Sequence, residues 1–284
     1  MQSIVPNAYP APTSAPGIVR ILCLGDVVAQ PGRRVLQELL PGLRQRLELD
    51  MIIANGENSA GGVGITATTA NDLFRAGVDV ITTGNHVWRH KECLAYIGKE
   101  PRLLRPANYP PKAPGRGLGL FSLPGGRQVA VLNLLGRVFM DAVDCPFQVA
   151  ERLCAEAREH TPLILVDFHA EATSEKRALA WFLDGKASFV FGTHTHVQTA
   201  DPMILPQGTA CLTDLGMCGV EAGSVLGMQQ ETSVRRFTTA LPHPFVSAKG
   251  EPGLNGALVE LDAATGKATV IHLVRRGGVS VLAV

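Results

Sequence analysis

The sequence has almost no net charge, with 26 lysines and arginines against 25 aspartates and glutamates among its 284 residues. It therefore lacks the basic excess of a duplex-binding protein, and we expect no duplex nucleic acid as a partner. A small anionic substrate or a short nucleotide is compatible with this balance, because a metal ion can bind an anion locally without a field from the whole protein.

Long apolar runs are also absent. No segment reaches the roughly 18 uninterrupted apolar residues of a membrane span, so we expect no membrane partner. Residues 1–17 contain four prolines and have neither the basic nor the apolar stretch of a secretory signal. We expect residues 1–17 to form a flexible N-terminal extension, followed by a single domain over residues 18–284.

Paired cysteine motifs are missing as well. The six cysteines form no CxxC pair and no zinc-finger spacing, and several lie in apolar or helical runs. Free cysteine in such a setting behaves as a small buried apolar side chain. We therefore expect reduced structural thiols and a cytoplasmic location.

Apolar strand patterns alternate with amphipathic helix patterns along the chain, as in a parallel α/β sheet. The pattern predicts strands at 18–25, 51–54, 78–83, 118–123, 128–134, 163–168, 189–191, 208–213, 257–261 and 268–274. It predicts helices at 31–47, 66–76, 89–98, 146–160, 174–183 and 231–239. The first helix is expected to be bent or divided at Pro41-Gly42. An α/β fold of two packed mixed sheets with helices outside fits this order best.

Five of the predicted strands end in a residue that can bind a metal. Strand ends are followed by Asp26, by Glu57 and Asn58, by Asn85 and His86, by His169, and by His194 and His196. Ligands of open α/β sheets bind beyond the carboxyl ends of the strands, so these side chains are expected at one place. Two carboxylates, amide oxygens and imidazoles together suit two adjacent ions of intermediate hardness, such as Fe, Mn or Zn.

Each of these residues also has a simpler interpretation. Asp26 and Asn85 could cap the helices that follow them, and Asn55-Gly56 could be an ordinary turn. The glycine-rich stretch 61–64 has no GK[ST], so we interpret it as a flexible rim of the site instead of a phosphate loop. Trp88 and Phe237 are more simply explained by packing than by stacking on a base. The ordered set as a whole is harder to explain by independent capping and turns.

The motifs resemble the calcineurin-like metallophosphoesterase superfamily. They occur in its order: Gly25-Asp26, Gly84-Asn85-His86, His169, and Gly192-Thr193-His194-Thr195-His196. Asn55-Gly56-Glu57-Asn58-Ser59, the segment 167–173 and Arg236-Phe237 narrow the resemblance to a bacterial subgroup with phosphodiesterase activity toward 2′,3′-cyclic nucleotides. The resemblance covers residues 18–278.

Three positions depart from the pattern of the broad superfamily. Val28 stands where a histidine is usual, Glu57 replaces the bridging aspartate, and Val87 replaces an acidic residue. Asn58 could take the place of the lost histidine ligand, as in the subgroup.

The resemblance implies two divalent or trivalent metal ions per chain. Asp26, Glu57, Asn58 and His196 would hold the first ion, and Glu57, Asn85, His169 and His194 the second. His86 would stay off the metals and protonate the leaving group as a general acid. A loop histidine beside a ligand is well placed for that task on its own chemistry.

The sequence therefore predicts a phosphodiesterase that hydrolyses small phosphodiesters, 2′,3′-cyclic nucleotides among them. A hydroxide that bridges the two metal ions would attack the phosphorus atom in line with the leaving group. Two alternatives stay open: a metal-binding regulatory protein with slow or vestigial activity, and another metallohydrolase such as an amidase. Assembly into a homo-oligomer is also left open.

Overall fold

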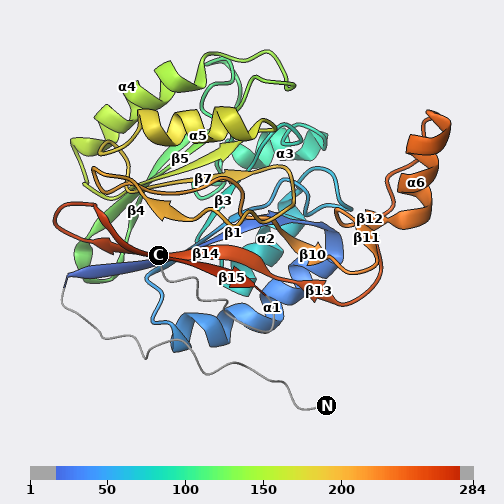
Figure 1. The fold of residues 1–284 in the computed structure, drawn as a ribbon, viewed down its shortest axis with the longest axis horizontal. Helices are drawn as coiled ribbons and strands as arrows, with labels where there is room; N and C mark the ends of the chain where they lie inside the picture. The colour runs from blue at the N-terminus through green and yellow to red at the C-terminus, as the bar shows by residue number, and fades with distance from the viewer. Residues whose placement is uncertain (1–16, 276–284) are drawn as a thin grey trace.

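The computed structural model describes residues 17–275, which form two β-sheets with helices on their outer faces (Figure 1). The helices are α1 (Ala29–Arg46), α2 (Ala67–Ala76), α3 (Lys91–Ile97), α4 (Pro146–Arg158), α5 (Thr173–Phe182) and α6 (Gln230–Thr239), with a 3₁₀ turn at Pro124–Gly126. The strands are β1 (Ile18–Val27), β2 (Met51–Asn55), β3 (Val80–Thr82), β4 (Leu118–Ser122), β5 (Gln128–Leu135), β6 (Ile164–His169), β7 (Phe189–Thr193), β8 (Met203–Ile204), β9 (Ala210–Leu212), β10 (Met217–Val220), β11 (Ser224–Val225), β12 (Met228–Gln229), β13 (Pro252–Gly253), β14 (Asn255–Asp262) and β15 (Ala268–Arg275).

Both large sheets are mixed. One has the order β13-β10-β1-β14-β15, with β2 pairing with β1 and β3 with β2; the other has the order β4-β5-β6-β7-β9-β8. Strands β1, β2 and β3 run parallel in the first sheet, and β5, β6, β7 and β9 run parallel in the second. The α/β class with two packed mixed sheets flanked by helices, predicted from the sequence, is confirmed.

Alternate side chains of each central strand pack on opposite faces of its sheet, against the other sheet on one face and against helices on the other. In β1, Ile21 and Cys23 face the second sheet, whereas Leu22 and Leu24 pack with α1 and α2. Phe189 of β7 is fully buried in the same layer between the sheets. A strand buried on both faces must be apolar at every position, which is why these segments read as continuous apolar runs in the sequence.

The first helix differs from expectation. α1 is not divided at Pro41 but continues through it to Arg46. Pro41 removes the backbone hydrogen bond to the carbonyl of Gln37, and both residues are exposed, so water can satisfy that carbonyl. Leu36 and Leu40 remain buried against the sheet. Packing of the apolar face therefore outweighs the break that the proline favours.

Several strands were not predicted. β8, β10, β11, β12 and β13 are each only two to four residues long, too short for a period-two pattern. The predicted flexible extension is almost entirely outside the described residues, as are residues 276–284 of the predicted domain, so both assignments stay predictions.

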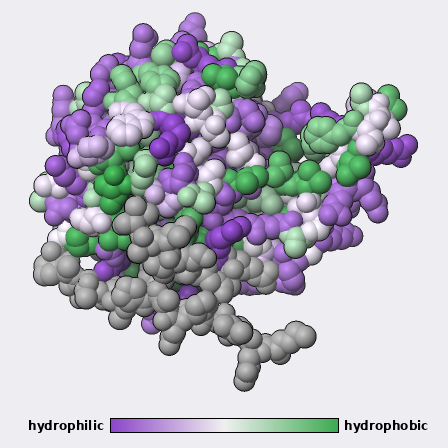
Figure 2. All heavy atoms as spheres, in the orientation of Figure 1, coloured by the Kyte–Doolittle hydropathy of each residue, from purple (hydrophilic) through white to green (hydrophobic). Residues whose placement is uncertain are grey.

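Helix α6 stands out from the rest of the described chain as an arm (Figure 1). None of its residues is buried. Figure 2 shows hydrophobic residues along the arm. The exposed large apolar side chains in this part of the chain are Leu226, Val234, Phe237, Leu241, Phe245 and Val246. A helix of ten residues is marginal in water without packing, so this element depends on what surrounds it.

Replacing Phe189 by alanine should test the layer between the sheets. The ring is fully buried beside Phe191, so we expect Phe189→Ala to lower the free energy of unfolding by about 3–5 kcal/mol. Phe139→Ala is the matched control: this ring is 90% exposed, and we expect a change within about 0.5 kcal/mol. Urea unfolding measures both; equal effects would show that the two sheets do not share a core.

Candidate metal centre

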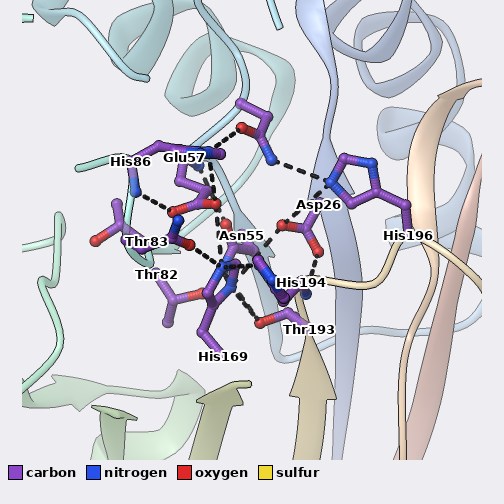
Figure 3. Close-up of polar contacts among 12 residues, drawn as sticks. Asp26, Asn55, Glu57, Thr82, Thr83, His86, His169, Thr193, His194 and His196 are labelled. Atoms are coloured by element: carbon purple, nitrogen blue, oxygen red, sulfur yellow. Dashed lines mark hydrogen bonds and ion pairs between the residues drawn. The ribbon is translucent and has the colours of Figure 1, made fainter. Parts of the chain in front are cut away.

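The carboxyl ends of strands from both sheets meet at one place (Figure 3). They bring together all eight side chains that the sequence predicted for the site: Asp26 at the end of β1, Glu57 and Asn58 after β2, Asn85 and His86 after β3, His169 at the end of β6, and His194 and His196 after β7. The convergence expected from strand order alone is therefore observed.

One half of the cluster centres on His169. Its Nε2 lies 3.1 Å from Glu57 Oε1, 3.1 Å from Asn85 Oδ1 and 3.0 Å from His194 Nδ1. Ligand atoms of Glu57, His169 and His194 all lie within 4.8 Å of one another, the spacing of groups that share one ion.

The other half of the cluster centres on His196. Its Nε2 lies 3.1 Å from Asn58 Nδ2 and 3.8 Å from Asp26 Oδ1. Asn58 also lies 2.9 Å from Nδ1 of His86, which is itself 3.2 Å from Glu57 Oε1. Glu57 thus lies within reach of His169 on one side and of His86 on the other.

Three of the four imidazoles in the cluster have their second nitrogen held by a residue outside it. The outer contacts are His169 Nδ1 with Thr193 Oγ1 at 2.9 Å, His194 Nε2 with Glu171 Oε2 at 3.0 Å, and His196 Nδ1 with the carbonyl of Leu226 at 3.0 Å. Such outer partners fix the tautomer and orient the inner nitrogen toward a metal. Glu171 and Leu226 were not predicted for this purpose, because neither has a signal in the sequence beyond lying near a motif.

A buried polar layer lies behind His169. Asp167 is fully buried and accepts hydrogen bonds from Thr193 Oγ1 at 2.7 Å, from Thr82 Oγ1, and from Asn55 Nδ2 at 3.3 Å. Burial raises the pKa of Asp167 to about 6. The sequence alone allows Asn55 to be an ordinary turn residue; its amide instead supports the wall of the site.

Asp26 and Glu57 each leave one oxygen unsatisfied. Asp26 Oδ2 accepts from the backbone N–H of His194 and Glu57 Oε2 from that of His86, both at 2.9 Å. Asp26 Oδ1 and Glu57 Oε1 accept no well-aligned hydrogen bond from the described residues, although both side chains are fully buried. The imidazole nitrogens that face these oxygens carry a positive charge only when protonated. A buried anionic acceptor without a donor is costly, and a cation would remove that cost. The donor set therefore fits a metal.

The pKa values of the histidines and carboxylates in the cluster show that its buried negative charge favours a nearby positive charge. Burial opposes protonation of His169, but the charges of Glu57, Asp26 and Asp167 outweigh it and raise the pKa of His169 to about 9. Burial also opposes ionisation of Glu57, yet His169 and His86 hold its pKa well below the usual range. His194 responds in the opposite direction: burial, followed by the charge of His169, lowers its pKa to about 3.

The loop that carries His194 and His196 is strained. Both residues have positive φ, 100° and 64°, a conformation that costs about 1–3 kcal/mol for residues other than glycine.

The capping interpretations of Asp26 and Asn85 are wrong, because Val28 is the N-terminal cap of α1 and His90 is the N-terminal cap of α3.

Close backbone approach at glycines sets the dimensions of the cluster. A Cβ on Gly84 would lie 2.3 Å from His169 Nε2 and 2.5 Å from Glu57 Oε2. A Cβ on Gly25 would lie 2.0 Å from the carbonyl oxygen of Gly216. No larger residue fits at either position without moving a strand or a ligand.

A cavity of about 680 Å³ opens beside the cluster. Its walls include Glu57, Asn58, His86, His194 and His196 from the site, Gly62 and Val63 from the glycine-rich stretch, and Ser233, Arg236 and Phe237 from α6. The predicted rim position of the glycine-rich stretch agrees with this lining. Phe237 is 82% exposed and so does not pack in a core.

None of the cysteines belongs to the cluster. All six are free, and five are buried. Burial raises the pKa of Cys154 and Cys218 to about 12 in each case, which keeps these thiols protonated.

The described helices include none with the length and apolar character to cross a bilayer. The predicted cytoplasmic location stays a prediction.

The comparison with known proteins identifies the family. A family model described as YmdB-like protein matches residues 22–274. The chain belongs to the YmdB-like family. This membership confirms the resemblance drawn from the sequence motifs. A 2′,3′-cyclic-nucleotide 2′-phosphodiesterase from Bacillus subtilis (strain 168) is 48% identical over 254 residues, which cover 89% of this chain and 96% of the relative.

One further relative and two solved structures are similar to this chain over most of its length. A putative phosphatase/phosphodiesterase from Mycoplasma pneumoniae is 36% identical, over 90% of this chain and 92% of its own. The crystal structure of a novel phosphatase from Mycoplasma pneumoniae superposes with a TM-score of 0.85 at 35% identity, over 91% and 93% of the two chains. A hypothetical protein from Thermus thermophilus superposes with a TM-score of 0.84 at 43% identity, over 90% and 98%.

Metal binding should release protons in a predictable direction. Without a metal, the neighbouring carboxylates raise the pKa of His169 to about 9. If His169 is a ligand, the metal must displace its proton. We expect roughly one proton released per site at pH 7.5, and an affinity for Mn²⁺ that rises about tenfold per pH unit from pH 7 to 9. Titration calorimetry in buffers of different ionisation enthalpy measures this. A Mn²⁺ affinity independent of pH in that range would show that His169 is not a metal ligand.

Proposed function

We propose that this chain is a metal-dependent phosphodiesterase that hydrolyses small phosphodiesters, with 2′,3′-cyclic nucleotides as the leading substrates. The single observation that carries the proposal is the pair of unsatisfied buried oxygens, Asp26 Oδ1 and Glu57 Oε1, facing the histidines of one cluster. The name of the Bacillus subtilis relative supports the substrate class.

Two metal ions, of Fe, Mn or Zn, would be held by the two halves of the cluster. Asp26, Asn58 and His196 would bind one ion; Asn85, His169 and His194 would bind the other; and Glu57 would bridge them. Bound ions would supply Lewis-acid activation of water and would neutralise the phosphodiester charge. The two carboxylates and the three outer partners of the imidazoles hold this arrangement before substrate arrives.

His86 would act as the general acid. Its Nδ1 contacts Asn58, and its side chain is about one-third exposed, on the wall of the cavity. In the structure Asn58 Oδ1 lies toward His86 Nδ1 and Asn58 Nδ2 toward His196 Nε2. If Asn58 binds a metal through its oxygen, the amide must be turned the other way, with the oxygen toward His196 and the NH₂ toward His86 Nδ1. The NH₂ then donates to Nδ1, which leaves the proton of neutral His86 on Nε2. That nitrogen would deliver the proton to the leaving alkoxide.

A turnover assay tests the proposed function directly. Protein loaded with Mn²⁺ should hydrolyse 2′,3′-cyclic AMP and bis-p-nitrophenyl phosphate, and a chelator should abolish both activities until metal is restored. Metal analysis of protein purified without chelators identifies the ions and should give two per chain. Metal binding without turnover would instead support a regulatory protein, and turnover by rigorously metal-free protein would remove the metal from the mechanism.

Glu57→Gln should weaken the site as a whole. A bridging carboxylate contacts both ions, so the neutral amide should lower metal occupancy and activity together, by roughly 10-fold to 100-fold or more. Metal content and kcat are measured on the same preparation. Glu100→Gln serves as the control, because Glu100 pairs with Arg102 away from the cluster. Unchanged occupancy in Glu57→Gln would show that this carboxylate does not bridge.

His86→Ala and Asn85→Ala should separate the acid from a ligand. We expect His86→Ala to keep both ions and to lose roughly 10²–10⁴ in kcat on a poor leaving group. The loss should shrink on p-nitrophenyl esters, whose leaving group hardly needs a proton. Asn85→Ala should deplete metal and slow both substrates alike. Depleted metal with equal losses on both esters for His86→Ala would make His86 a ligand.

A further inference from the structure

The strained loop that carries His194 and His196 needs an anchor. Both histidines adopt positive φ, and the loop belongs to no helix or strand after β7 ends at Thr193. Thr195, between the two histidines, is one of the points at which the rest of the chain holds this loop. Its backbone N–H and its hydroxyl both donate to Asp214 Oδ2, at 3.2 Å and 2.8 Å.

Asp214 is itself held from several directions. Its Oδ1 accepts from the backbone N–H of Gly216 at 2.8 Å, and the backbone carbonyl of Gly192 accepts from the N–H of Leu215 at 2.9 Å. A Cβ on Gly192 would lie 1.8 Å from the carbonyl oxygen of Thr213. The backbone of the segment around Asp214 therefore packs directly against the backbone at the end of β7, and neither segment can shift without breaking these contacts.

A lysine from another element completes this arrangement. Lys176 of α5 places its Nζ 2.6 Å from Asp214 Oδ2, and the two side chains are 2% and 1% exposed. A buried ion pair is weak evidence for stability, because removing two charges from water costs about as much as their attraction returns. Three donors converge on Asp214 Oδ2, and a carboxylate is the side chain that can accept all of them.

We propose that Lys176 and Asp214 are positioning residues that set the conformation of the loop for metal binding by His194 and His196. This rests on the proposed function only in assigning those two histidines to metals. Lys176 is the buried partner of the Asp214 carboxylate. Asp214 accepts from Thr195 and so orients the histidine on either side of it. Neither residue belongs to the cluster or lines the cavity beside it.

A pair of variants separates positioning from plain stabilisation. Lys176→Met leaves Asp214 buried and uncompensated, so it should lower both the melting temperature and the affinity for Mn²⁺. The double variant Lys176→Met/Asp214→Asn removes both charges and should bring the melting temperature back toward that of the unmodified protein. Its affinity should stay roughly 10-fold to 100-fold weaker, because an amide has only one acceptor oxygen and cannot accept from both Thr195 and the Gly216 N–H.

The measurements are melting temperature and Mn²⁺ affinity by titration calorimetry, with kcat on bis-p-nitrophenyl phosphate beside them. Recovery of Mn²⁺ affinity together with melting temperature in the double variant would overturn the proposal and leave the pair with a structural role. The exposed pair Lys186–Glu151 is the matched control; Lys186→Met/Glu151→Gln should change neither quantity.

Thr195→Val covers the case in which the double variant fails to fold. It keeps the shape of the side chain and the buried pair but removes the hydroxyl donor to Asp214. We expect a Mn²⁺ affinity about fivefold weaker at an unchanged melting temperature, and an unchanged affinity would count against the proposal. If the unmodified protein binds Mn²⁺ but turns over no phosphodiester, the proposed function fails while this comparison still stands.

Discussion

Two carboxylates removed from water, Asp26 and Glu57, impose a constraint on everything around them. Each is fully buried and satisfied on only one oxygen, and isolated charges in such a place are unfavourable by several kcal/mol or more each. The chain responds by bringing three imidazoles to them from β6 and from the loop after β7. The surrounding fold has to be built so that strands from two different sheets end at the same point, and the four-layer packing does this.

Much of this arrangement could be predicted from the sequence. Strands buried on both faces read as apolar runs, and the polar residue that ends each run marks the carboxyl edge of a sheet, so the eight site residues follow from pattern and topology. The end of α2 was equally predictable, because Gly77 adopts the left-handed conformation that ends the helix. These features depend on local periodicity and on the chemistry of single residues.

Other features depend on contacts between distant segments and have no local signal. The continuity of α1 through Pro41 is decided by Leu36 and Leu40 packing on the sheet. β10 is four residues long and exists because its backbone pairs with Asp26 and Val27. The pairing of Lys176 with Asp214, 38 positions apart, joins two segments that carry no shared motif. A pattern within one segment does not report which distant segment it will contact.

The glycines at the strand ends have a consequence for how such a site can diversify. At Gly25, Gly84 and Gly192 the approach is so close that an added Cβ would overlap a backbone carbonyl or a ligand itself. The separation between ligand positions is thus fixed by main-chain packing, independently of which side chain occupies each one. Replacing one ligand residue by another type, for example at the positions of Glu57 and Asn58, can therefore change which metal is preferred. The backbone that spaces the ligand positions keeps its dimensions.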